Sequence, residues 1–278
     1  MTSTRSSDSI VRLRHLAVGY AHRPVASQLD AALESGTLCA LLAPNGRGKS
    51  TLLRTMAALQ RPVEGMVEWG GRDATLMTPG EMARTVSIVL TLRPEAPSLS
   101  VRQVVEMGRI PYAGCFRRIT GDDRQRVDEA LSLTQTEALA DRRIGTLSDG
   151  ERQRVFVAKA LAQATPAILL DEPTAFLDFP SKVEMFRLLS RLAHNEGRTI
   201  VVSTHDVELA LQFADHLWLL DHQGIVAGTP QELAADGSIG RFFQAEGLRF
   251  DSSSLRFVLD PCCPHQKTNS SNSSLSSI

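Results

Sequence analysis

The stretch that decides the fold begins with the apolar run TLCALL at residues 37–42, which leads directly into APNGRGKST at residues 43–51. A second apolar pattern follows at residues 52–59 and has the spacing of a helix with a buried face. The middle segment matches the phosphate-loop pattern G-x-x-x-x-G-K-[ST] except at its first position, where this chain has Ala43. Strand, glycine-rich loop and helix therefore follow one another in the order that a phosphate-binding loop requires.

The residue types in this loop suit a phosphate chain accompanied by Mg²⁺. Gly46 and Gly48 allow backbone N–H groups to curl round a β-phosphate at a helix N-terminus. Lys49 can bridge the β- and γ-phosphates, and the Ser50 hydroxyl can ligate Mg²⁺. Ala43 is a small change at the loop entrance, and we expect it to be tolerated if its φ stays negative. The structural alternative is a glycine-rich turn that happens to contain a lysine.

A second strand ends in two carboxylates. The segment AILLDE at residues 167–172 is apolar up to Asp171 and Glu172. Beside a phosphate loop, Asp171 would hold the Mg²⁺ hydration shell, and Glu172 would polarise the attacking water as a general base. His205 follows the apolar run at residues 199–203 and would complete a γ-phosphate site as a sensor. Acidic residues that cap a strand end, and a histidine with a structural role, are the alternatives.

Short apolar runs alternate with helical patterns along the chain, which favours an α/β layer architecture. The runs at residues 37–42, 85–90, 167–170 and 199–203 are nearly all apolar, as expected for strands of a sheet that is covered on both faces. Between residues 98 and 164 the strand signal fades. Helical patterns lie there at residues 101–108, 122–139 and 150–163, which predicts a helical insertion between two halves of a nucleotide-binding core.

The composition excludes several other classes. The 278 residues carry 30 basic and 31 acidic side chains, so the net charge of −1 gives no general attraction to nucleic acid. Four cysteines do not make a disulfide framework in a chain of this length, and a reducing compartment is favoured. No run of 18 apolar residues indicates a membrane span, and residues 1–8 lack the apolar core of a secretory signal. Residues 1–8 and the Ser/Asn-rich residues 262–278 are expected to be disordered.

Several other patterns are interpreted as structural. The CCPH segment at residues 262–265 lacks a second ligand pair at zinc spacing, which argues against a metal site. The aromatic side chains of Phe242, Phe243 and Phe250 are expected to anchor the C-terminal segment to the core. Arg142 and Arg143 are expected to lie on a solvated face.

At residues 147–154 the sequence LSDGERQR resembles the LSGGQ marker of the ATP-binding-cassette (ABC) ATPases. Other family markers occur in order over about residues 10–245. Tyr20 lies 29 residues before Lys49, AFLD at residues 175–178 looks like the D-loop, and THD at residues 204–206 looks like the H-switch. Ser148 followed by Glu151 also has the pattern of a capping box that opens an amphipathic helix.

The resemblance implies an α/β P-loop NTPase (RecA-like) core with an antiparallel N-terminal sheet and an inserted α-helical subdomain at about residues 95–162. Within an ATPase domain at residues 9–261, it implies that Glu172 and His205 are catalytic. Mg²⁺ would be held by Ser50, Asp171 and Thr91, the last of which is short and could act only through a water or a shifted loop. The residues implied to contact ATP are Tyr20, which would stack on adenine, and Asn45, Gly46, Gly48, Lys49, Ser50, Thr51, Ser148, Gly150, Glu151 and Asp178.

The resemblance also implies partners. Two chains would pair head to tail and sandwich two ATP molecules, so that the marker of one chain faces the γ-phosphate bound to the other. The helical subdomain and residues 91–97 would dock on a separate membrane permease at the cytoplasmic face of the membrane, with an extracytoplasmic substrate-binding protein as an indirect partner. The GRIPY segment at residues 108–112 looks most like importers of iron-siderophore, haem and vitamin B12 complexes.

Three positions depart from the family pattern. Thr91 stands where a glutamine is expected, and Asp149 and Glu151 replace the usual Gly and Gln of the marker. We expect Asp149 to point to solvent, because a carboxylate beside an anion site is unfavourable. The departures leave open a slow or regulatory ATPase, and a soluble ABC ATPase of the kind that acts in iron–sulfur cluster assembly shares every nucleotide motif. An active transport ATPase is preferred because the catalytic residue types are all present.

Overall fold

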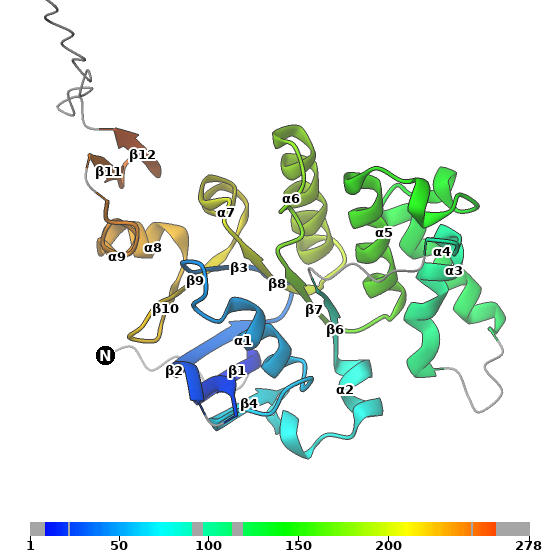
Figure 1. The fold of residues 1–278 in the computed structure, drawn as a ribbon, viewed down its shortest axis with the longest axis horizontal. Coiled ribbons are helices and arrows are strands. Elements are labelled where there is room, and N and C mark those ends of the chain that lie inside the picture. The colour runs from blue at the N-terminus through cyan, green and yellow to red at the C-terminus, as the bar shows by residue number, and fades with distance from the viewer. Residues whose placement is uncertain (1–8, 22, 91–96, 113–118, 246, 260–278) are drawn as a thin grey trace, which may run out of the picture.

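The computed structural model describes residues 9–21, 23–90, 97–112, 119–245 and 247–259. The centre of the molecule is a six-stranded sheet with the order β10-β9-β3-β8-β7-β6 (Figure 1). Its strands pair in parallel except for β10, which is antiparallel to β9. The strands are β3 (Leu38–Leu42), β6 (Val86–Val89), β7 (Ala167–Asp171), β8 (Thr199–Thr204), β9 (His216–Leu220) and β10 (Ile225–Gly228).

Both faces of this sheet are covered, which explains why its strands are nearly all apolar. Along β3, Leu38, Ala40 and Leu42 point into one hydrophobic cluster, and Cys39 and Leu41 point into another. All five residues are buried. A strand with alternating polar residues would place them in one of these two cores. The four predicted strands are therefore confirmed, and β9 and β10 are additions to them.

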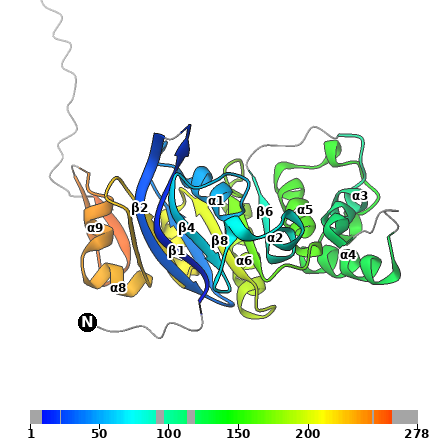
Figure 2. The same cartoon turned by 90° about the horizontal axis from the view of Figure 1, so that it is seen from below.

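One face is covered by helix α1 (Lys49–Met56) and a second, antiparallel sheet with the order β2-β1-β4-β5. Figure 2 shows β1, β2 and β4 as a layer beside α1. The predicted antiparallel N-terminal sheet is thus confirmed. Its strands are β1 (Ser9–Tyr20), β2 (Arg23–Glu34), β4 (Glu64–Trp69) and β5 (Arg72–Asp73).

The opposite face is covered by α6 (Phe179–His194) and α7 (Val207–Phe213). Helix α2 (Pro79–Thr85) precedes β6, and a group of helices then lies between β6 and β7 along the chain, to one side of the sheet (Figures 1 and 2). This helical group comprises α3 (Val101–Glu106), α4 (Gly121–Leu133), α5 (Asp149–Ala162) and 3₁₀ turns at Met107–Tyr112, Glu137–Leu139 and Ile144–Thr146.

The predicted boundaries of three helices are wrong. The helix predicted at residues 52–59 begins earlier, at Lys49, and ends before Ala58, which has a left-handed φ of 53°. The helix predicted at residues 122–139 ends at Leu133, because Gln135 has a left-handed φ of 57° and the chain turns there. The helix predicted at residues 101–108 is α-helical only to Glu106 and continues as the 3₁₀ turn.

The C-terminal part of the described chain is held by an aromatic cluster. Helices α8 (Pro230–Ala235) and α9 (Ser238–Phe242) precede a hairpin of β11 (Leu248–Asp251) and β12 (Arg256–Leu259). The rings of Phe242 and Phe243 pack edge to face at 4.8 Å, and Phe250 joins them through Phe257. These rings pack against the main core, as predicted.

No helix in the described residues is both long and apolar enough to cross a bilayer.

Candidate nucleotide-binding and catalytic site

The phosphate loop joins β3 to α1 at the carboxyl edge of the central sheet. Gly46 and Gly48 have φ values of 76° and 91°, in the left-handed region that favours glycine. Ala43 keeps a negative φ, so the loss of glycine at that position causes no backbone strain. Gly48 is the N-cap of α1, and no side chain caps the first turn. The N–H groups of this turn are therefore available to an anion.

Lys49 lies over the loop that precedes it, and its side chain is only 5% exposed. Its Nζ donates to the carbonyl oxygen of Ala43 at 3.2 Å and lies 3.4 Å from Glu172 Oε1 and 3.0 Å from His205 Nε2. Burial lowers the pKa of Lys49, and the Glu172 carboxylate opposes this shift. The ammonium thus sits where it can meet a phosphate oxygen with little competition from water.

Glu172 and His205 meet beside this lysine. Glu172 Oε1 lies 2.8 Å from His205 Nε2, and Glu172 has a left-handed φ of 50°. The N–H of Glu172 donates to both the carbonyl oxygen and the Oγ of Ser203, at 3.2 and 3.0 Å. A strained backbone held by two hydrogen bonds aims the carboxylate away from the strand and toward the loop.

Ser203 is a site residue that the sequence analysis missed. Its hydroxyl also donates to Asp171 Oδ1 at 2.8 Å, so one side chain orients both neighbouring acidic residues. The register of the sheet places Asp171 beside Ser203 on the adjacent strand. Asp171 is 3% exposed, and Ser50 is half-buried. A hydroxyl and a carboxylate are the oxygen donors that Mg²⁺ prefers, so these two residues fit that ion.

A second network connects the end of β8 to the start of α6. Asp206 accepts hydrogen bonds from Thr174 Oγ1 at 2.7 Å and Lys182 Nζ at 2.6 Å. Asp178 caps α6 by accepting from the Ser181 N–H at 3.1 Å, and the hydrogen bonds from Ser181 lower the pKa of Asp178. Thr174 and Lys182 were not predicted as site residues, and Asp206 was noted only as the last residue of the H-switch pattern. A direct contact between Asp178 and nucleotide stays a prediction.

Tyr20 ends β1 next to the first turn of α1. Tyr20 is 53% exposed as a residue, and its hydroxyl accepts a hydrogen bond from Thr51 Oγ1 at 3.3 Å. An exposed ring fixed beside the phosphate loop can form a stacking surface for a base. Asn45 lies exposed on the rim of the same loop. Thr91 lies outside the described residues.

The marker segment opens α5 as the sequence predicts. Ser148 is the N-cap, its hydroxyl accepts from the Glu151 N–H, and its N–H and hydroxyl both donate to Glu151 Oε2 at 2.8 and 3.0 Å. Asp149 is partly exposed and forms an ion pair with Arg152. A Cβ on Gly150 would lie 3.7 Å from Ser181 Oγ, an ordinary contact. The capping box is therefore confirmed. The Asp149 side chain is partly exposed to solvent, as expected, and it also pairs with the Arg152 guanidinium.

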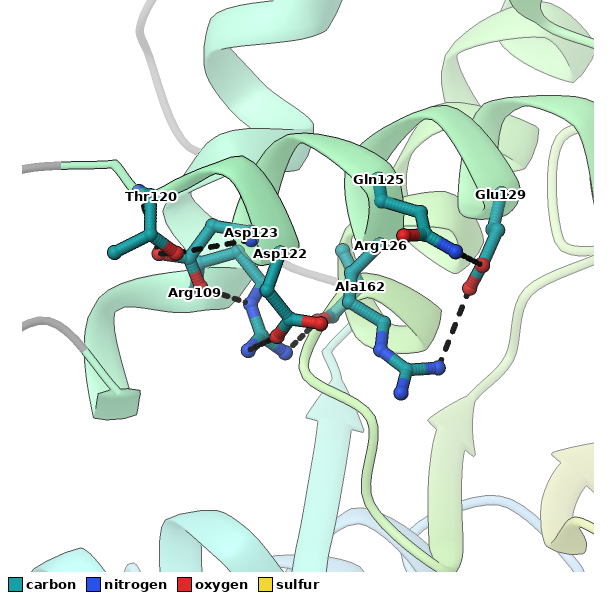
Figure 3. Close-up of polar contacts among 8 residues, drawn as sticks. All are labelled: Arg109, Thr120, Asp122, Asp123, Gln125, Arg126, Glu129 and Ala162. Carbon is teal, nitrogen blue, oxygen red and sulfur yellow. Dashed lines mark hydrogen bonds and ion pairs between the residues drawn. The ribbon is translucent and has the colours of Figure 1, made fainter.

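The segment at residues 108–112 has a structural role in the described chain. Arg109 is buried, and its guanidinium donates to Asp123 Oδ1 at 2.8 Å and to the carbonyl oxygen of Ala162 at 2.7 Å (Figure 3). The Cζ atom of Arg109 lies over the Tyr112 ring, 4.1 Å from the ring centroid. Asp123 also completes a capping box with Thr120. Arg109 thus joins the start of α4 to the end of α5.

Comparison with known proteins places these motifs in one family. A family model described as ABC transporter matches residues 26–175. The achromobactin transport ATP-binding protein of Dickeya dadantii is 37% identical, over 89% of this chain and 90% of that protein. The ferric enterobactin transport ATP-binding protein of Escherichia coli K12 is 36% identical, over 87% of this chain and 90% of that protein. An inward-facing metal-chelate-type ABC transporter structure superposes with a TM-score of 0.72 and 29% identity, over 81% of this chain and 85% of that one.

Proposed function

Because the chain belongs to the ABC transporter family of ATP-binding proteins, we propose that it hydrolyses ATP to drive uptake of an iron-siderophore complex, haem or cobalamin through a separate membrane permease. The iron complex is favoured because the E. coli relative carries ferric enterobactin in its name. The observation that carries the ATPase reaction is the convergence of Lys49, Glu172 and His205 over an uncapped helix N-terminus.

These residues divide the work of binding and hydrolysis. The N–H groups at the start of α1 and the Lys49 ammonium bind the β- and γ-phosphates. Since Lys49 is within 3.4 Å of Glu172, an arriving γ-phosphate competes with that carboxylate for the ammonium. The Glu172 carboxylate then accepts a proton from water, while His205 holds that carboxylate in position.

The chemical step is an in-line displacement at the γ-phosphorus. The water oxygen forms a bond to phosphorus as the bond to the β–γ bridging oxygen breaks, and ADP keeps the electron pair. Glu172 takes the water proton and returns it to the solvent or to the phosphate product. Ser50 and Asp171 would hold Mg²⁺, which supplies charge neutralisation of the phosphates when bound. Thr91, which is outside the described residues, is proposed as a third contributor to this metal site.

We infer a head-to-tail homodimer as the active assembly, with the α5 marker of one chain facing ATP in the other. The nucleotide-contacting set would then comprise Tyr20, the loop residues, the marker residues Ser148, Gly150 and Glu151, and Asp178. ATP binding would close this dimer, and product release would reopen it. The boundaries proposed for the ATPase domain are residues 9–261, with a helical subdomain at about residues 95–162.

The docking surface for the permease would include an apolar cleft between α2, β6 and α5. The cleft has a volume of about 450 Å³ and contains Met77, Met82 and Phe156, with Lys159 and Gln163 as polar residues. It reaches Leu90, which directly precedes the loop at residues 91–97 that the family resemblance assigns to docking. An apolar cleft with a few polar groups suits an amphipathic segment of a partner. Such docking would hold the chain at the cytoplasmic face of the membrane.

A tagged Glu172→Gln chain, which should hold ATP without hydrolysing it, tests this proposal by capture of partners from native membranes with ATP. We expect a polytopic membrane protein among the captured partners. Leu59 lines the cleft and is 62% exposed, so adding Leu59→Glu should abolish capture. Leu76 is 80% exposed outside the cleft, and Leu76→Glu is the matched control. Capture of soluble partners alone would favour the assembly ATPase.

Phosphate release from Mg-ATP tests the catalytic half separately. The unaltered chain should release phosphate about a hundredfold faster than the Glu172→Gln chain, because a general base contributes that order of rate. Equal rates in the presence of the captured permease would favour the slow regulatory ATPase.

A further inference from the structure

The first turn of α5 carries two carboxylates, and each faces an arginine. Asp149 pairs with Arg152 one turn along the same helix. Glu151 Oε1 lies 3.6 Å from Arg142, which precedes the helix and also donates to the carbonyl oxygen of Thr146 at 2.9 Å. Arg142 is exposed, as predicted, and in addition pairs with this carboxylate. Both acidic departures from the family marker thus come with a compensating cation.

These carboxylates create an electrostatic conflict at the marker. The N–H groups at a helix N-terminus favour an anion, but fixed negative charges within a few ångströms repel one. Hydrogen bonds from Ser148 hold the pKa of Glu151 below its usual range, so this side chain stays ionised at neutral pH. A phosphate that approaches the first turn would meet a negative end unless the carboxylates were neutralised.

We propose that Arg152 and Arg142 are positioning residues that neutralise Asp149 and Glu151, so that the first turn of α5 can receive the γ-phosphate of ATP bound to a second copy of this chain. The inference rests on the proposed head-to-tail dimer. The Arg152 side chain, which is 25% exposed, lies on the same helix three residues after Asp149. It pairs with the Asp149 carboxylate and so holds that carboxylate against the helix surface. Arg142 acts from the preceding turn on the outer oxygen of Glu151, while Ser148 holds the other oxygen.

A purely structural role makes a different prediction. Ion pairs at i,i+3 spacing also stabilise an isolated helix slightly. Arg126 and Glu129 form such a pair on α4 at 3.3 Å (Figure 3), in a part of the helical group that carries no marker residue. Arg126→Gln is therefore a control that removes an ion pair of the same spacing, with arginine and carboxylate in the reverse order along the helix. A positioning role also requires that removing the neighbouring carboxylate cancels the loss of the arginine.

The test measures ATP-dependent dimerisation of the full chain, with Glu172→Gln present in every variant. Sedimentation reports the fraction of dimer at each of a series of rising ATP concentrations. We expect Arg152→Gln to raise the ATP concentration for half-maximal dimerisation about tenfold, which corresponds to a cost of about 1.4 kcal/mol for one uncompensated charge near a phosphate. Asp149→Asn added to Arg152→Gln should restore the original value, and Arg152→Lys should retain it. Arg142→Gln and its rescue by Glu151→Gln form a second, independent cycle.

The outcomes separate this inference from the function on which it rests. Binding of a fluorescent ATP analogue to each monomer should be unchanged, which shows that the variants fold and that the phosphate loop is intact. If the Glu172→Gln chain dimerises with ATP but Arg152→Gln behaves like Arg126→Gln, the inference alone is overturned. A defect that persists in the Arg152→Gln/Asp149→Asn chain overturns it as well. If the Glu172→Gln chain stays monomeric at saturating ATP, both the proposed dimer and this inference fail.

Discussion

His205 Nε2 lies 2.8 Å from Glu172 Oε1, and the same nitrogen lies 3.0 Å from the Nζ of Lys49. The imidazole therefore touches both the residue that would bind the γ-phosphate and the residue that would activate water. Its side chain is 47% exposed, whereas Lys49 is almost fully buried. The histidine thus forms the solvent-facing wall of the cluster.

Replacing His205 by alanine should lower kcat for ATP about a hundredfold, because the Glu172 carboxylate loses the group that orients it. Affinity for ATP should change little, since the phosphate loop and Lys49 are intact. His194 provides a matched control, because its Nε2 lies 2.9 Å from Asp215 Oδ2 at the opposite end of the strands, next to the start of β3. Steady-state phosphate release measures both variants, and equal losses in the two would argue against an orienting role for His205.

The ring of Tyr20 should supply affinity for the base rather than for the phosphates. Base stacking contributes about 1–3 kcal/mol, so Tyr20→Ala should weaken ATP binding roughly tenfold. Tyr20→Phe keeps the ring and loses only the hydrogen bond from Thr51. Calorimetry with ATP and with inorganic triphosphate distinguishes the two contributions. A loss of triphosphate affinity in Tyr20→Ala would mean that the ring supports the loop instead.

The site could be predicted from sequence where a residue's role depends on its neighbours along the chain. Gly46, Gly48 and Lys49 follow a strand and start a helix, so their positions follow from local order. Ser203 could not be found in this way, because its role arises from the register between β7 and β8. Asp206 likewise acts through Lys182, which lies 24 residues earlier on another helix.

Helix boundaries were less predictable for a related reason. The apolar pattern continues past Leu133, but the buried Thr134 hydroxyl donates to the carbonyl oxygen of Ala130 at 2.9 Å and accepts from the Thr136 hydroxyl at 2.9 Å. The backbone N–H groups of Thr134 and Thr136 also donate to the carbonyl oxygens of Ala130 and Leu131, so the chain leaves the helix with these carbonyl groups paired. Arg109 shows the same limit, since the sequence suggests a family marker there and the structure reveals a buried connection between α4 and α5.

Asp123 should make the stability of the helical group dependent on pH in the acid range. The backbone hydrogen bond from Thr120, then Arg109, lower the pKa of Asp123 to about 2. A depressed carboxyl pKa contributes stability above the unfolded-state value of about 3.9, and this contribution is lost as pH falls toward the folded value. The urea midpoint should therefore decrease between about pH 4 and about pH 2.

Asp123→Asn should be less stable at neutral pH and should show a flatter dependence over that interval. Asp122 is the matched control, because its side chain is 70% exposed and lies 4.0 Å from Arg109. Asp122→Asn should follow the curve of the unaltered chain. Parallel curves for the Asp123→Asn chain and the unaltered chain would show that Asp123 is not the group responsible.

Gly108 should be intolerant of any side chain, because its backbone packs directly on α5. A Cβ at this position would lie 2.3 Å from the carbonyl oxygen of Lys159 and 3.1 Å from the Cβ of Ala162. Relief of this overlap requires the 3₁₀ turn to move away from α5, which would also weaken the hydrogen bond from Arg109 to Ala162. Gly108→Ala should therefore lower the free energy of unfolding by roughly 1–3 kcal/mol.

Gly121 is the matched control for this substitution, since a Cβ there would meet nothing within 4 Å. Gly121→Ala should be neutral or slightly stabilising, because it lies at the start of α4 and alanine reduces the entropy of the unfolded chain. Chemical denaturation of both variants gives the comparison. Equal stability would mean that the turn at Met107–Tyr112 can separate from α5 at little cost, and the connection through Arg109 would then be too weak to couple α4 to the marker helix.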